Sequence, residues 1–579
     1  MLNHKKNNTT VVFTVGAFIG LIIFIAIYGL DIVNVTNDSL IINGYLEKDI
    51  AQHYAGWMLF RNSPWQFPLG VGQNISYPFG SAVSYTDSIP LFAIFFKVFR
   101  NFLPETFQYF GIFVMLCFML QGAFGGLLTN LFNKNIIVNA LASAVFVLSP
   151  IMIERAFRHC ALTAHFLILS ALYYYFKNKG RTDFKATIPF FIINALAITI
   201  HPYFLPFTFG IMFAFCVENF VLHKKYITSP AYVLLSIVFT LFVGYSIGAF
   251  YISGSMSSIG YGMFSMNLNA LHNPVSKGFE NWSAILEIKP NVSYQIEGFN
   301  YLGLGIIAFI PVVCILYLII YKKEFFSTAL SFAINNFGII FSTLALLVFA
   351  VGDWITFGGL QIVRLPIPQQ LIDGIFGIFR ANGRFGWLLV YSIVIFTTFI
   401  LGKIKNRNIS ALLLCVLLFV QVFDMRGVLS SKNAYFTSSE GDLQKQVYNE
   451  ILKNSFWDDA AEKYEVGHMI SSYIGNSSIE IAIKFGKNNH AVNTCFEARQ
   501  NTDIIDEINN NIINSIMNGT LEDNMFVIIR DVGENIVSAA KEHNYSIYSV
   551  ENMYAICSNK FTDEEITIYK NEGNFQVVC

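Results

Sequence analysis

Four side chains capable of acid–base and anion chemistry recur at every fourth position between residues 49 and 61. Asp49, His53, Trp57 and Arg61 combine a carboxylate, an imidazole, an aromatic ring and a guanidinium. Residues four apart lie on one face of a helix, so the spacing predicts a single stripe. A carboxylate beside an imidazole suits proton transfer, and a guanidinium suits an anionic substrate. The same residues also fit a solvated helix face with an interfacial tryptophan.

A second acid, Asp87, stands three residues before Pro90. Pro90 fits the first turn of a helix over residues 88–100, and Asp87 is then a candidate N-cap. Asp87 is equally a candidate for a second acid of the active site, and the sequence leaves both interpretations open.

Further ionisable groups gather where two apolar segments meet. Glu154, Arg158, His159 and His165 fall within twelve residues, and charges at that depth are costly unless they are paired or hydrated. One ion pair explains Glu154 and one arginine, so we expect Arg158 and His159 to contact substrate. His201 precedes a proline between two apolar segments, where a turn residue is the simpler interpretation and a substrate contact the alternative.

Two later polar stretches carry the remaining candidates. Glu297 and Asn300 end the loop 251–298, and Arg380 and Arg384 end the loop 353–385. Paired arginines suit phosphate, whether in a bound substrate or in a lipid headgroup. We interpret both pairs as substrate-binding residues.

The segments that must position these groups are strongly apolar. Of 579 residues, 54% are hydrophobic and only 13% are charged, about half the charge of a typical soluble domain. The net charge is -1, whereas nucleic-acid-binding domains are strongly basic, so the composition does not indicate nucleic-acid binding. The fold class expected is an α-helical polytopic membrane protein with about eleven transmembrane helices. The apolar segments are residues 11–30, 107–131, 136–154, 161–177, 186–200, 203–221, 228–250, 299–321, 334–352, 386–402 and 410–424.

The charges between these segments predict the orientation. The short connections are basic, beginning with Lys5 and Lys6, and the positive-inside rule places them in the cytoplasm. The loops 31–106, 251–298 and 353–385 then lie outside it. Residues 88–100 are too few to span a bilayer and are expected to form an interfacial helix.

The tail is expected to be a soluble extracytoplasmic α/β domain over residues 426–579, after a transmembrane domain over residues 1–425. Residues 525–530, 545–550 and 553–557 read as strands, with a helix near 533–542. No CxxC motif occurs among the eight cysteines, and pairing of Cys495 with Cys557 is left open.

Taken together, residues 1–425 resemble the GT-C superfamily of integral-membrane glycosyltransferases. The resemblance rests on an uncleaved first helix, a large first outer loop with an early acid (Asp49), and an extracytoplasmic tail domain. Within that superfamily the chain looks most like a bacterial membrane family. The shared positions are Asp49, Gln52, His53, Gly56, Trp57, Phe60, Arg61, Tyr77, Pro78, Gly80, Thr86, Asp87, Ser88, Pro90, Arg158, His159, Ala161, Leu162, His165, Glu297, Gly298, Asn300, Tyr301, Leu302, Gly303, Arg380, Asn382, Gly383 and Arg384.

This resemblance implies an enzyme of the bacterial cytoplasmic membrane, with its N-terminus in the cytoplasm. It would move a sugar from a polyprenyl-phosphate donor to an extracytoplasmic acceptor, either a cell-envelope glycan, a lipid or a protein. Asp49 would act as general base, and Asp87 matches the second acid of some relatives. No metal-ligand cluster is evident, so no metal is expected, although relatives differ in needing a divalent ion. The alternatives are a flippase for lipid-linked glycans and a non-catalytic scaffold or sensor, both also in contact with membrane lipids.

Overall fold

The apolar segments predicted from the sequence all contain helices in the computed structural model. The structure describes residues 2–45, 47–251, 260–292, 294–438, 452–470, 477–499 and 501–579. The chain divides into two compact units. Unit 1 comprises Met1–Asn34, Tyr109–Val243 and Ser257–Ser439, and unit 2 comprises Val35–Gln108, Gly244–Met256 and Glu440–Cys579.

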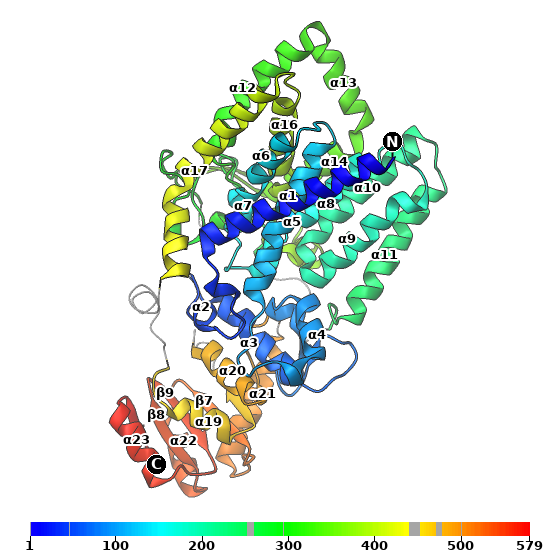
Figure 1. Ribbon diagram of the computed structural model, residues 1–579. Helices are drawn as coiled ribbons and strands as arrows, with labels where there is room; N and C mark the ends of the chain where they lie inside the picture. The colour runs from blue at the N-terminus through cyan, green and yellow to red at the C-terminus, as the bar shows by residue number, and fades with distance from the viewer. Residues whose placement is uncertain are drawn as a thin grey trace. The chain divides into compact units, whose positions relative to one another are not determined.

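Most of the regular secondary structure in the described part of unit 1 is helical, and the labelled helices can be followed in Figure 1. Its hairpin strands are β3 (Trp354–Phe357) and β4 (Leu360–Arg364). Its helices are α1 (Leu2–Tyr28), α5 (Phe110–Asn130), α6 (Ile136–Val147), α7 (Pro150–Ile153), α8 (Phe166–Lys177), α9 (Phe184–Ile200), α10 (Leu205–Leu222), α11 (Thr228–Ser246), α12 (Leu304–Tyr321), α13 (Phe325–Asn335), α14 (Phe337–Val351), α15 (Gln369–Gly374), α16 (Trp387–Gly402) and α17 (Arg407–Thr437).

Seven helical stretches of the described chain have the length and apolar composition to cross a membrane, which makes this a multi-pass membrane protein. They are Thr9–Tyr28, Phe110–Asn130, Pro202–Leu222, Thr228–Ser246, Leu304–Asn335, Asn382–Gly402 and Arg407–Thr437.

Four of the predicted segments form shorter helices. These are α6, α8, α9 and α14, of which α6 and α8 have 12 residues each. A helix of that length rises about 18 Å, less than the roughly 30 Å of a bilayer core. The side chains of α8 are almost all buried, and backbone that leaves the helix is tolerated at membrane depth when protein covers it. The full number of eleven crossings therefore stays a prediction.

Glycines allow α1 and α5 to pack closely. A Cβ built on Gly20 would lie 2.1 Å from the carbonyl oxygen of Phe118, and one on Gly16 would lie 2.4 Å from that of Gly122. Small residues four apart permit this approach between apolar helices.

Unit 2 joins the first predicted outer loop to the tail. The loop part contains α2 (Ser39–Asn43), α3 (Asp49–Asn62), β1 (Val71–Gly72), β2 (Ser81–Ala82) and α4 (Pro90–Val98). The tail part contains α19 (Phe456–Lys463), β5 (Val466–Met469), α20 (Ser477–Lys487), β6 (Ala491–Val492), α21 (Thr502–Met517), β7 (Met525–Ile529), α22 (Glu534–Glu542), β8 (Ser546–Val550), β9 (Met553–Cys557), α23 (Asp563–Glu572) and β10 (Phe575–Val577).

The tail folds around a mixed six-stranded sheet with the order β10-β8-β9-β7-β5-β6. Strands β6, β5 and β7 are parallel, and β9, β8 and β10 continue the sheet antiparallel. This confirms the α/β prediction and the three predicted strands. The core includes Val466, Val527, Ile529, Ile547 and Ile556.

The structure groups the chain differently from the expected division at residues 425 and 426. Helix α17 runs through that point to Thr437, and the first outer loop belongs with the tail. Several bonds join the two parts of unit 2. Asn62 Nδ2 donates to Gly486 O at 2.9 Å, and Lys48 Nζ lies 3.2 Å from Glu480 Oε1.

All eight cysteines lie in the described chain as free thiols. The Cys495–Cys557 pairing left open by the sequence is therefore absent from this structure.

Candidate functional site

Helix α3 of unit 2 contains all four residues of the predicted stripe, and Asp49 is its first residue. An acid in the first turn is stabilised by the helix dipole. From Ile50 onward almost every side chain is buried, whereas Asp49 and Gln52 remain partly exposed. Carboxylate oxygens of Glu47 and Asp49 lie within 4.8 Å of each other. The accessible chemistry of this helix is therefore concentrated at its N-terminal end.

Asp87 faces α3 from a strained turn. Its carboxylate Oδ2 lies 3.9 Å from His53 Nε2, and the imidazole is almost fully buried. Asp87 and Ile89 both have φ of 54°, which is a costly conformation for a β-branched residue such as Ile89. Ser88 Oγ donates to the carbonyl of His53 at 2.6 Å and fixes this turn to the helix.

The N-cap interpretation of Asp87 is wrong. The N-cap of α4 is Ile89, no side chain caps that helix, and Pro90 is its first residue. The aspartate is thus left facing His53, an arrangement suited to orienting an imidazole or to sharing a proton.

The other half of the stripe has structural contacts. Trp57 Nε1 donates to Phe107 O at 2.8 Å. Arg61 donates to the carbonyls of Glu105 at 2.8 Å and Leu103 at 3.1 Å. These bonds hold the returning end of the loop against α3. Substrate binding by Trp57 and Arg61 stays a prediction, and the contacts explain both residues without it.

Two pairs of potential metal ligands occur in unit 2, namely Glu47 with Asp49 and His53 with Asp87. Either pair can also act in proton transfer.

Unit 1 contains a buried cluster of opposite charges. Glu154 forms ion pairs with two arginines. Its Oε1 lies 2.6 Å from Arg158 Nη1, and its Oε2 lies 2.8 Å from Arg155 Nε. Glu297 also pairs with two arginines, both through its Oε2. This oxygen lies 3.3 Å from Arg384 Nη2 and 3.4 Å from Arg155 Nη1. Arg155 therefore bridges the two glutamates, which are 143 positions apart in the sequence.

Glu297 has a third cationic neighbour among the described residues. Lys277 Nζ lies 3.7 Å from its carboxylate. Burial alone would raise the pKa of Glu297, but Arg155 and then Arg384 lower it to about 2. Glu297 is consequently ionised at neutral pH.

Arg384 retains hydrogen-bonding capacity. Its side chain is 10% exposed, and its Nε is buried without a hydrogen-bond partner in the described part of the chain. A buried guanidinium N–H in this state is costly unless an acceptor reaches it.

Two sequence motifs meet beside the cluster. Asn300 Nδ2 donates to the carbonyls of Gly298 at 2.8 Å and Gly383 at 2.9 Å. Asn300 thereby positions the turns that carry Glu297 and Arg384. Arg380, predicted to act with Arg384, is exposed instead, so the structure separates the environments of the two arginines.

The two candidate histidines of unit 1 differ from the buried charges. His201 Nδ1 accepts from Tyr203 N at 3.1 Å and caps a short 3-10 turn, as expected for a turn residue. His159 is partly exposed and precedes the 3-10 helix Cys160–Thr163. The structure neither adds nor removes a substrate role for either residue.

A polar chain inside the helices was not predicted. Gln121 Nε2 donates to Tyr391 Oη at 2.9 Å, and Tyr391 Oη lies 2.8 Å from His165 Nδ1. The His165 ring also packs against Trp387, with 4.3 Å between ring centroids. A glutamine within an apolar segment was the available sequence signal. Arg155 was likewise missed, although it occurs next to Glu154.

Comparison with curated proteins finds none that matches the chain. Residues 17–426 match the family described as a domain of unknown function (DUF6311). That range covers most of the chain, including Asp49, Asp87 and the whole charge cluster of unit 1. The protein therefore belongs to the DUF6311 family.

Proposed function

We propose that this protein is a membrane glycosyltransferase of the GT-C type, with eleven transmembrane helices and its long loops outside the cytoplasm. It transfers a sugar from a polyprenyl-phosphate donor to a hydroxyl group of an extracytoplasmic acceptor.

The observation that carries this proposal is the buried Nε–H of Arg384, which has no hydrogen-bond partner in the described part of the chain. The Nη2 of the same guanidinium donates to Glu297 at 3.3 Å. A phosphate placed against Arg384 would accept the unused Nε hydrogen. In a weakly hydrated site such contacts stabilise charge that develops on a leaving group.

The proton acceptor is Asp49. As the acceptor hydroxyl attacks the anomeric carbon, a new C–O bond forms and the bond from that carbon to the phosphate oxygen breaks. The hydroxyl proton passes to the Asp49 carboxylate, and the electron pair leaves with the polyprenyl phosphate. Attack opposite to the leaving group inverts the anomeric centre. Asp87 and His53 orient the acceptor or share the proton, and no step passes through a metal.

The test is a transfer assay on the full chain in lipid nanodiscs. Polyprenyl-phosphate donors labelled in the sugar are incubated with an envelope extract, and label transfer is followed. Asp49→Asn should reduce turnover by about 10²- to 10⁴-fold, the usual contribution of a general base. Arg384→Gln should reduce it by about 10²-fold or more.

Asp373→Asn and Arg426→Gln are matched controls, because both positions are exposed and neither belongs to the proposed site. Full activity of Asp49→Asn would refute the assignment of the base. If wild type and Asp49→Asn bind the donor equally, transfer no sugar and move the lipid between leaflets, a flippase is the correct function.

A further inference from the structure

A tyrosine between two apolar helices of unit 1 lies beside Arg384. Tyr203 belongs to the 3-10 helix Pro202–Phe204, which links α9 to α10. Its backbone N–H donates to the capping imidazole of His201 at 3.1 Å, and the proline before it restricts the chain further. The backbone of Tyr203 is therefore held firmly where the two helices meet.

The side chain of Tyr203 contacts the segment that carries Arg384 at several points. Its ring packs edge-on against Phe379 and face to face with Phe385, at centroid distances of 5.3 and 5.8 Å. Its hydroxyl accepts a hydrogen bond from Ala381 N at 2.9 Å. One side chain thus fixes the backbone just before Arg384 and the ring just after it.

Tyr203 also contacts the guanidinium itself. Arg384 Cζ lies 5.1 Å from the centroid of the Tyr203 ring, within the ~6 Å reach of a cation–π interaction. The attraction is stronger where the cation is desolvated, and the Arg384 side chain is only 10% exposed. Because this attraction needs no acceptor atom, the hydrogen-bonding capacity of the guanidinium remains for other partners.

Arg384 needs such support because a second arginine shares its counter-charge. Arg384 Nη2 and Arg155 Nη1 both lie against Glu297 Oε2, at 3.3 and 3.4 Å, so two like charges meet at one oxygen and repel each other. Glu297 holds Nη2, whereas the buried Nε of Arg384 has no hydrogen-bond partner in the part of the chain that the structure describes.

We propose that Tyr203 is a positioning residue for the phosphate site. It holds the guanidinium of Arg384 against the repulsion of Arg155 and keeps the Nε–H directed at the phosphate. An aromatic ring suits this role, because it attracts the cation without accepting the hydrogen that the ligand needs. The identity of the ligand rests on the proposed function, and Tyr203 acts on it only through Arg384.

The test is isothermal titration calorimetry on the full chain in nanodiscs, with farnesyl phosphate as the probe and empty nanodiscs as the blank. Tyr203→Leu removes both the ring and the hydroxyl, and it should raise the Kd about tenfold. Tyr203→Phe removes only the hydroxyl and keeps the ring, so it should restore most of the affinity and raise the Kd by about threefold or less. Melting curves establish that each variant is folded.

A double-mutant cycle separates positioning from a general structural role. In an Arg384→Gln background, Tyr203→Leu should change the Kd by less than about twofold, because the guanidinium that it positions is gone. Loosening of the fold would instead weaken binding by the same factor in both backgrounds.

Tyr261→Leu is the matched control. Tyr261 stacks on Phe376, with 5.1 Å between ring centroids, and forms no ion pair, hydrogen bond or ring contact with Arg384 among the described residues. This variant also removes a tyrosine from the surroundings of the loop 353–385, but it should bind the probe as the wild type does.

The proposal is overturned if Tyr203→Leu binds farnesyl phosphate as tightly as the wild type, or if its effect is the same in both backgrounds. Either result leaves the proposed function intact when Arg384→Gln alone still weakens binding. If the wild type does not bind the probe, or if Arg384→Gln binds it as the wild type does, the phosphate site and the role of Tyr203 are both refuted.

Discussion

The Lys48–Glu480 ion pair joins the start of α3 to α20 inside unit 2, and its removal should loosen the loop from the tail. The two charged atoms are 3.2 Å apart, and both side chains are about 5% exposed. Glu480→Gln keeps the shape of the side chain but leaves the Lys48 ammonium buried without its counter-charge. Breaking a buried pair in this way costs about 3–5 kcal/mol.

Labelling of Cys495 measures this opening directly. The thiol is buried, and the strands and turns around it are bonded to the first loop through Val492 O and Ala498 N. Its burial also raises the pKa of the thiol, so native labelling should be slow. At tenfold per 1.4 kcal/mol, Glu480→Gln should speed labelling by roughly 10²-fold to about 4 × 10³-fold, as followed by mass spectrometry of the tail peptides.

Two further variants give the comparison. Asp458→Asn removes a pair in which the acid is 61% exposed, and its effect should stay below about 1 kcal/mol. Lys48→Met combined with Glu480→Gln should recover much of the loss, because no unpaired ammonium remains. If Glu480→Gln labels as slowly as Asp458→Asn, the loop and tail are not coupled through this pair and the reasoning fails.

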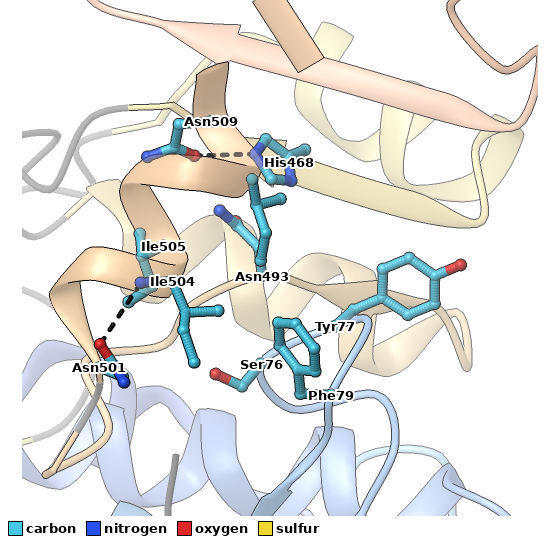
Figure 2. Close-up of a pocket in the computed structure, with 10 residues that line it drawn as sticks. Ser76, Tyr77, Phe79, His468, Asn493, Asn501, Ile504, Ile505 and Asn509 are labelled. Carbon is cyan, nitrogen blue, oxygen red and sulfur yellow. Dashed lines mark hydrogen bonds between the residues drawn. The ribbon is translucent and has the colours of Figure 1, made fainter. Parts of the chain in front are cut away.

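Three other predictions follow from single sites. Burial lowers the pKa of His468 to about 4, although its hydrogen bond to Asn509, drawn in Figure 2, opposes the shift. Between about pH 6.5 and pH 4, His468 is protonated in the unfolded state but stays neutral in the folded state. Lowering the pH through this range should therefore reduce the stability of the tail by up to about 3 kcal/mol. Hydrogen exchange of the sheet at both pH values measures this loss, and His468→Asn should remove most of the pH dependence. Gly56→Ala would place a Cβ 2.2 Å from Thr86 Oγ1, so it should lower both the activity and the melting temperature. An unchanged melting curve would contradict the close packing of Gly56 against Thr86. Gly20→Ala would place a Cβ 2.1 Å from the backbone oxygen of Phe118, so it should reduce the melting temperature in detergent. Gly427→Ala is the control, because its Cβ would have no atom within 4 Å, and it should leave the melting temperature unchanged.

The candidate site could be predicted from the sequence only where its signal was local. The four-residue spacing identified α3, which contains all four residues of the stripe. The pairing of Glu297 with Arg155 and Arg384 could not be read from spacing, because those residues come from three separate segments. The hydrogen bonds of Trp57 and Arg61 could not be predicted from the sequence for the same reason. Their acceptors are backbone carbonyls about 40 to 50 positions away.

Composition and periodicity by themselves determined the helical, membrane-spanning character of the chain and the strands of the tail. These properties depend on neighbouring residues, through transfer of apolar surface and local backbone preference. Only the tertiary structure decided that the first loop folds with the tail, which apolar segments form short helices, and which buried charges pair in unit 1. Those outcomes depend on contacts between residues hundreds of positions apart, whose free energies no local pattern encodes.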